Sequence, residues 1–297
     1  MTDAPVAARP PQDRAGWLRG LHRVFGHKLL LTGLLLCVAV AAVALLADVI
    51  QVQAPERMRV RDAFAAPGRS YPFGTDNLGR DIYSRVVHGA RLSLLIGLAT
   101  VALTAVAGTV LGCVAGYFRG WDEPVMRVMD ALMSFPAVLL AVAITAALGP
   151  SAVNAVIALA AVYAPRTARI VRASVLVVRE MDYVEAAQAV GASQPRVLCL
   201  HVLPNCLTPL LVQLTFVFAY AVLAEAALSF LGMGPPPPTP TWGNIIAEGR
   251  DYIREAPWIC LFPGGAISLA VLGLNLLGDG LRDVLDPRMR VEVTETA

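Results

Sequence analysis

Long apolar runs separated by shorter polar connections dominate the chain. The hydrocarbon core of a bilayer is about 30 Å thick and a helix rises about 1.5 Å per residue, so one crossing needs about 20 apolar residues. Six runs meet this requirement: 29–50, 92–117, 126–148, 152–171, 206–231 and 258–278. Because lipid offers no hydrogen-bond partner to the backbone, each run is predicted to be a helix. We therefore expect an all-α integral membrane protein with six transmembrane helices.

The basic residues before the first run indicate its orientation. This flank contains Arg9, Arg14, Arg19, Arg23 and Lys28. Lys and Arg accumulate on the cytoplasmic side of membrane helices, so residues 1–28 are predicted to be a cytoplasmic tail. Six crossings then return a second tail, 282–297, to the same side. The arginine-rich segment 51–91 is expected outside, because the first helix usually dominates orientation.

The composition narrows the range of possible functions. The chain is 57% hydrophobic and only 15% charged, with a mean hydropathy of +0.62, whereas soluble domains carry about 25% charged residues. A net charge of +2 gives no reason to expect nucleic acid as a partner. The five cysteines form no close pairs, and no glycine-rich phosphate loop occurs. We expect no catalytic residue, metal or cofactor, so that any ATP chemistry must come from a partner.

The connection between the fourth and fifth runs, residues 180–205, is predicted to form two short helices. The first has an acidic first turn that includes Glu185 and ends at Gly191. Ser193 can cap the second helix, and Pro204 is expected to redirect the chain into the fifth run. The first helix would present a face of small side chains that a partner could contact: Ala186, Ala187 and Ala189.

A polar stretch precedes the second apolar run, within residues 51–91. Residues 75–77 are Thr, Asp and Asn, which favour the start of a helix. Apolar side chains from Leu78 to Ala90 then recur at helical spacing. This predicts an amphipathic helix on the outer membrane surface, which acts either as an anchor or in gating or docking. The residues assigned to the gating or docking alternative are Gly74, Thr75, Asp76, Gly79, Arg80 and Asp81.

Glu225 is the one acidic residue well inside an apolar run. It follows Cys206 by 19 residues, which is about 28 Å across a core of about 30 Å. It is therefore expected near the outer boundary. A role in helix packing is favoured there over contact with a substrate amine. In the second run, a glycine ladder predicts close packing of another helix: Gly108, Gly112 and Gly116.

Several of these segments resemble a known family. Residues 185–187 (Glu-Ala-Ala), Gly191 and residues 201–204 (His-Val-Leu-Pro) resemble the EAA loop of bacterial ATP-binding cassette importer permeases. The generic loop has an apolar residue in place of His201, but the peptide-importer branch often has histidine. Three further stretches resemble the C-type permease of dipeptide, oligopeptide and nickel importers: 72–94, 228–243 and 278–288.

The resemblance implies a permease subunit of a type I importer in the bacterial inner membrane. It would form half of a translocation pathway for di- or oligopeptides, with a five-helix core over 92–281. The implied partners are ATPase subunits, a second homologous permease in a heterodimer, and an extracytoplasmic substrate-binding protein. The residues implied to contact the ATPase are Glu185, Ala186, Ala187, Gly191 and Pro204.

Three alternatives remain open at this stage. Nickel, glutathione or another small solute could replace the peptide as substrate. A secondary transporter would need ion-coupling acids within the membrane or two related halves, and neither is evident. A purely structural membrane subunit would not explain the polar helical connection at 180–205.

Overall fold

The computed structural model describes residues 27–285, and this part of the chain is built from helices without a β-strand. The longer helices are α2 (Lys28–Leu45), α4 (Ile82–Tyr117), α5 (Arg119–Met133), α6 (Ala137–Leu148), α7 (Ala152–Val178), α10 (Leu203–Phe230) and α12 (Trp258–Leu285). The shorter ones are α3 (Ala47–Ile50), η1 (Val60–Asp62), α8 (Asp182–Ala189), α9 (Gln194–Val197), the π-helix η2 (Leu198–Val202), α11 (Trp242–Gly249) and η3 (Arg250–Tyr252). The predicted all-α fold class is confirmed.

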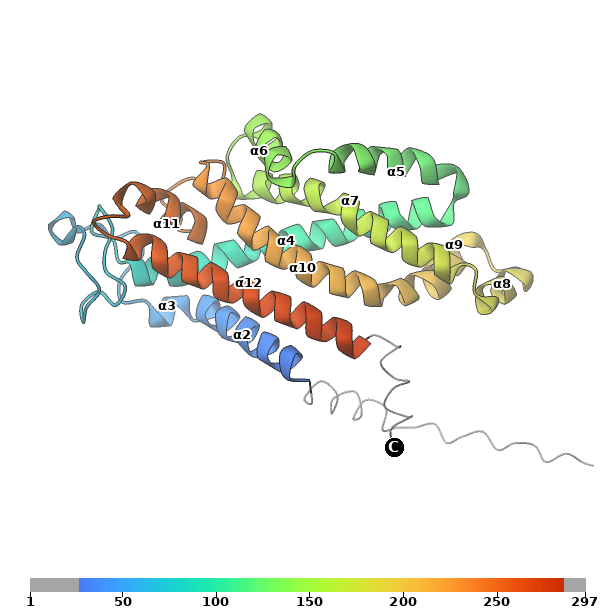
Figure 1. Cartoon of the computed structure of the whole chain (residues 1–297), viewed down its shortest axis with the longest axis horizontal. Coiled ribbons are helices and arrows are strands. Elements are labelled where there is room, and N and C mark those ends of the chain that lie inside the picture. Colours follow the sequence, from blue (N-terminus) through green and yellow to red (C-terminus); the bar gives the residue numbers. More distant parts are fainter. Residues whose placement is uncertain (1–26, 286–297) are drawn as a thin grey trace, which may run out of the picture.

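α2, α4, α7, α10 and α12 lie side by side along the longest axis of the molecule (Figure 1). α4 packs along α7, α12 packs along α2, and α10 contacts both α7 and α12. Small residues allow these close approaches. A Cβ atom at Gly112 would lie 2.6 Å from the carbonyl oxygen of Ala168, and one at Gly116 would lie 2.8 Å from Cβ of Val175. The glycine ladder therefore packs against another helix, as expected.

Between residues 27 and 285, four helical segments are long and apolar enough to cross a membrane: Lys28–Leu45, Ile82–Tyr117, Gln194–Phe230 and Trp258–Leu285. The prediction of one helix over 126–148 is wrong, because α5 and α6 meet at 93°. Pro136 precedes α6; proline cannot donate a backbone hydrogen bond and disfavours a helical residue before it. The bent pair gives a fifth span if its two helices count as one. α7 is not one of these segments, and it carries three arginines in its second half. The total of six spans therefore stays a prediction.

The ends of the bundle differ in what they carry. The start of α2, the end of α12 and the pair α8 and α9 lie toward one end, whereas α11 and the segment before α4 lie at the other (Figure 1). His27 Nε2 lies 3.3 Å from the carboxylate of Asp283, which joins the start of α2 to the end of α12. This arrangement agrees with the predicted grouping of both flanks with the 180–205 connection. Their location in the cytoplasm stays a prediction.

The interfacial helix expected before the second span is absent from the described residues, and its prediction is wrong. Residues 74–81 form turns, and α4 begins at Ile82 with Asp81 as its cap. Gly74 and Gly79 both have positive φ, at 75° and 71°, which interrupts any helix. Of the apolar positions assigned to that helix, Ile82, Val86 and Ala90 instead lie in the protein core.

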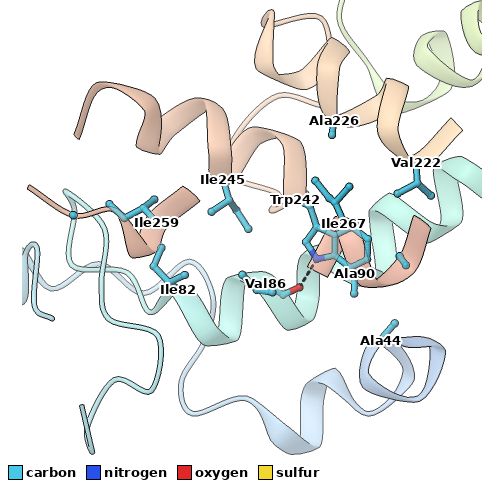
Figure 2. Close-up of a cluster of buried hydrophobic side chains, with 12 residues drawn as sticks. Ala44, Ile82, Val86, Ala90, Val222, Ala226, Trp242, Ile245, Ile259 and Ile267 are labelled. Atoms are coloured by element: carbon cyan, nitrogen blue, oxygen red, sulfur yellow. Dashed lines mark hydrogen bonds between the residues drawn. The ribbon is translucent and has the colours of Figure 1, made fainter. Parts of the chain in front are cut away.

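This core surrounds Trp242 of α11 (Figure 2). The indole Nε1 donates a hydrogen bond to the carbonyl oxygen of Val86, 2.9 Å away. Side chains from α2, α4, α10 and α12 surround the ring, among them Ala44, Ala90, Val222 and Ile267. The core therefore joins four of the long helices at the end that carries α11.

Pro204 does not redirect the chain, so that expectation is also wrong. α9, η2 and α10 form one helical segment of 37 residues, Gln194–Phe230. Pro204 lies in the first turn of α10, directly after the π-helix, in which the amide of Leu203 donates to the carbonyl of Leu198. The π-turn shifts the hydrogen-bond register directly before Pro204, so the segment continues although proline has no amide proton to donate.

Candidate functional sites

The first candidate site is the pair α8 and α9, residues 182–197, which we call the coupling hairpin. α8 ends in a Schellman motif, in which Ala192 donates to the carbonyl of Ala187 at 3.1 Å and Gly191 donates to that of Gln188 at 2.9 Å. Gly191 has a φ of +87°. A Cβ atom placed there would meet nothing within 4 Å. The backbone conformation, and not crowding, therefore favours glycine at this position.

One face of the coupling hairpin is fixed to the bundle. Val184 and Val197 are fully buried, and they pack with side chains of α4, α7 and α10. One polar contact adds to this packing, because Tyr117 of α4 donates its hydroxyl to Gln194 at 2.5 Å. Just before the hairpin, Arg179 at the end of α7 donates to the carbonyl of Gly116 of α4 at 2.8 Å. The hairpin is thus attached to three long helices at once.

The opposite face of the coupling hairpin is exposed. Glu185 and Ala186 are exposed, and Ala187 is half-buried. Val190 is 86% exposed, and Met181 and Tyr183 are exposed beside it. A grouping of exposed apolar and small side chains is typical of a contact surface. Pro204 is also exposed, but at the start of α10, outside the hairpin.

The second candidate site is a buried ionic cluster at the other end of the bundle, which we call the outer charge cluster. Asp76 Oδ2 accepts from Arg80 Nε at 2.6 Å and from Arg85 Nη1 at 2.7 Å. Both arginines also donate to Glu248 Oε2, at 2.5 and 2.7 Å. Asp76, Arg80 and Arg85 are each at most 5% exposed. Two carboxylates thus balance two guanidinium groups, and the bonds connect α11 to the start of α4.

The sequence placed only part of this cluster. Asp76 and Arg80 were expected to belong to one site, and they contact each other. Arg85 lies in the stretch that was predicted to be a surface helix, but it is 1% exposed. Glu248 was missed, because it lies 163 residues after Arg85 and no local motif marks it. Only the charge balance could have suggested it, since a buried pair of arginines needs more than one carboxylate.

The remaining residues of the 74–81 segment hold the backbone around the cluster. Thr75 donates its hydroxyl to the carbonyl of Asp62 at 2.5 Å and accepts from the amide of Ala65 at 2.8 Å. A Cβ atom at Gly79 would lie 1.8 Å from the carbonyl oxygen of Arg59. Asp81 caps α4 by accepting from the amide of Ser84 at 2.9 Å. These residues are buried and shape the fold around the cluster.

Glu225 belongs to a third polar group, inside the bundle near the outer charge cluster. Its carboxylate accepts from Ser229 at 2.8 Å and from Ser93 at 3.2 Å. The hydroxyl oxygen of Ser93 also accepts from the amide of Trp242 at 3.2 Å. Glu225 is 0% exposed. The contacts connect α10 with α4 and α11, which supports the packing interpretation over contact with a substrate.

Together these features define a multi-pass membrane protein with an exposed hairpin at one end and buried ionic contacts at the other. Residues 108–291 match the family of binding-protein-dependent transport system inner membrane components, and the chain belongs to this family. It is therefore an inner membrane component of a transport system.

Relatives cover nearly the whole chain. It is 55% identical over 270 residues to a putative peptide transport system permease protein of Brucella abortus, with 91% of each chain covered. A di/tripeptide transport system permease protein of Pseudomonas aeruginosa is 45% identical over 299 residues, with 98% of each covered. The fold is similar to that of the MetNI methionine ABC transporter in inward-facing conformations. The TM-score is 0.58 at 19% identity, covering 69% of this chain and 98% of that chain.

Proposed function

We propose that this chain is the permease subunit of an ATP-binding cassette importer for di- and oligopeptides, and that partner subunits hydrolyse the ATP. The observation that carries the proposal is the similarity along nearly the entire chain to permeases named for peptides and di/tripeptides. Such similarity includes both candidate sites and is not confined to the membrane spans.

The coupling hairpin is the proposed contact with the ATPase. Its exposed face, around Glu185, Ala186 and Ala187, is free to enter a groove of a partner. Its buried face is fixed to α4, α7 and α10 through Val184 and Val197. A displacement of the hairpin would therefore move the attached helices as a unit, because packed interiors transmit strain. Gly191 would fix the hairpin's shape by ending α8.

The proposed assembly also contains a second homologous permease and an extracytoplasmic binding protein. One chain supplies one coupling hairpin, whereas a pair of ATPases offers two grooves. A second permease would therefore be required, and the resemblance to C-type permeases favours a heterodimer over a homodimer. The outer charge cluster would hold α11 and the start of α4 in place on the side that receives the binding protein, so that residues 74–81 act in docking or gating through the shape of this surface.

A secondary transporter is less well supported. Such a protein would need a membrane acid that an ion can reach. Glu225 is enclosed and its carboxylate accepts bonds from two serines. The substrate alternatives, nickel and glutathione, are separated from peptides by the transport experiment below.

The test is transport by the reconstituted complex in vesicles. The chain is combined with its ATPases, its partner permease and its binding protein, and uptake of a labelled dipeptide is measured with ATP or a non-hydrolysable analogue. Parallel vesicles receive labelled nickel or glutathione. We expect ATP-dependent dipeptide uptake that disappears when either permease is omitted. Uptake with this chain as the only permease would overturn the heterodimer, and uptake of nickel or glutathione without dipeptide would overturn the peptide assignment.

A further inference from the structure

A basic pocket lies between α7, α10 and α12, on the half of the bundle nearer the coupling hairpin. Its volume is about 480 Å³. α10 contacts both neighbouring helices and separates them (Figure 1). The polar residues that line the pocket are Arg166, Thr208, Gln213 and Arg282. The other lining residues are apolar: Ile170, Pro209, Val212, Phe216 and Leu285.

The two arginines of this pocket differ from the other arginines of α7. Arg169 pairs with Asp130 at 2.6 Å, and Arg172 pairs with Asp122 at 2.5 Å. Within residues 27–285, neither Arg166 nor Arg282 lies within salt-bridge distance of a carboxylate. Two positive charges from two helices therefore face one pocket without an opposing charge from the described chain. A membrane helix is expected to place such charges where an anion can meet them.

The lining residues limit the chemistry of that anion. The planar guanidinium group donates parallel hydrogen bonds that fit the oxygens of a phosphate. Among the described residues, no acidic side chain lines the pocket, so they offer nothing to the ammonium group of a zwitterionic peptide. Its apolar residues, among them Ile170 and Phe216, fit hydrocarbon. Arg282 lies in the last turn of α12, close to the expected membrane boundary.

We propose that this pocket binds the phosphate headgroup of an anionic phospholipid, with Arg166 and Arg282 as its cationic ligands and the apolar lining against the upper acyl chains. Basic pockets between membrane helices on the cytoplasmic side suit such headgroups. The pocket lies beside α7 and α10, the helices that lead to and from the coupling hairpin. A bound lipid would hold these helices at a fixed separation from α12. The proposal does not depend on the transported substrate.

The test is lipid binding by the full chain in detergent, measured by native mass spectrometry. The two probes are dioleoyl phosphatidylglycerol and dioleoyl phosphatidylcholine, which share their acyl chains and differ in net charge. Each arginine near a membrane surface contributes to anionic lipid binding by a factor of about five. We expect Arg166→Gln and Arg282→Gln each to weaken phosphatidylglycerol binding about fivefold, and the double variant about thirtyfold. Phosphatidylcholine binding should not change.

Three further arms make the result decisive. Arg169→Gln, a matched change on the same helix, should leave phosphatidylglycerol binding at the wild-type level. The double variant Arg166→Lys, Arg282→Lys keeps both positive charges and should retain most of the phosphatidylglycerol binding. It keeps the proposal testable if the glutamine variants fail to fold. Glycerol 3-phosphate and alanyl-alanine are added as competitors. Equal binding of both lipids, an unchanged double glutamine variant, or displacement by either soluble competitor at millimolar concentration would overturn the proposal.

Discussion

The two ends of the bundle use glycine at positive φ in opposite ways. Gly191 ends α8 in open space, where an added Cβ meets nothing within 4 Å. Gly79, near the outer charge cluster, has an Arg59 carbonyl oxygen where its Cβ would be, at 1.8 Å. The first glycine shapes a surface and the second permits an internal contact. The same backbone conformation therefore lies on an exposed surface at one end and in a packed interior at the other.

The coupling hairpin and the outer charge cluster also differ in whether their charged side chains are exposed or buried. The coupling hairpin keeps both of its acidic residues, Asp182 and Glu185, exposed and buries only apolar side chains. The outer charge cluster buries two arginines and Asp76 within the protein. Substitutions in the exposed face of the hairpin should therefore change the proposed partner contacts more than the stability of the fold. Substitutions in the outer charge cluster should lower the stability first. Four changes test this difference, in order of their expected effect on folding.

Removing Asp76 should have the largest effect. Asp76→Ala leaves Arg80 and Arg85 buried with only Glu248 to balance them. Breaking a buried pair in this way costs about 3–5 kcal/mol. The apparent melting temperature of the purified protein in detergent measures the loss. Glu123→Ala is the matched control, since its pair with Arg127 is exposed and costs about 0–1 kcal/mol. Equal melting temperatures for both variants would contradict the central role of the outer charge cluster.

Ser93→Ala should have an intermediate effect. The change removes a donor to Glu225 and an acceptor of the Trp242 amide. An unsatisfied buried polar group costs about 1–3 kcal/mol. Ser268→Ala serves as control, because the Ser268 hydroxyl is exposed and bonds only to the carbonyl of Gly264. If thermal unfolding does not distinguish the two variants, Glu225 has no stabilising contact with α4.

Gly191→Val should reduce stability little and transport strongly. A side chain at positive φ costs about 1–2 kcal/mol, and there is no clash to add to it. The altered end of α8 should displace the docking face, so that dipeptide uptake and stimulated ATPase activity fall while membrane insertion stays normal. Gly120→Val is the control, since its Cβ also has free space but φ is not positive. Wild-type transport by Gly191→Val would falsify the docking role of the hairpin.

Cysteine labelling tests whether the two regions face opposite sides, without an effect on stability. Single cysteines at Asn77 and Gln188 are placed in a background free of the five native cysteines, of which Cys199 is exposed near the hairpin. An impermeant thiol reagent should label residue 77 from outside and residue 188 only after permeabilisation. Labelling of both from one side would contradict the six-span model, which places three spans between the two residues.

Hydropathy predicted the long helices well because each must bury its backbone in lipid, whatever its neighbours are. α2 and α12 therefore lie close to the runs predicted for them. The bend between α5 and α6 was missed although Pro136 marks it, since the apolar run continues across the break. The 74–81 segment was misassigned because Thr, Asp and Asn favour turns as well as helix starts. In this segment, the positive φ angles of Gly74 and Gly79 favour turns over a helix.

Contacts between distant segments could not be predicted from local pattern. Glu248 meets Arg85 only because α11 folds back against α4. Glu225 was placed near the outer boundary by counting residues, but its contacts with Ser93 depend on how α10 and α4 pack. The coupling hairpin was predicted more successfully, since short-range rules govern a helix end such as that at Gly191.

The uninterrupted helix from Gln194 to Phe230 has a mechanical consequence. Its 37 residues span about 55 Å, nearly twice the thickness of the hydrocarbon core. One end belongs to the coupling hairpin, and the other holds Glu225 against Ser93 of α4. In the predicted topology, this one helical segment would be a rod that reaches from one aqueous side to the other. A small tilt of this rod at the hairpin would reappear, with reversed direction, as a sideways displacement at the far side of the membrane.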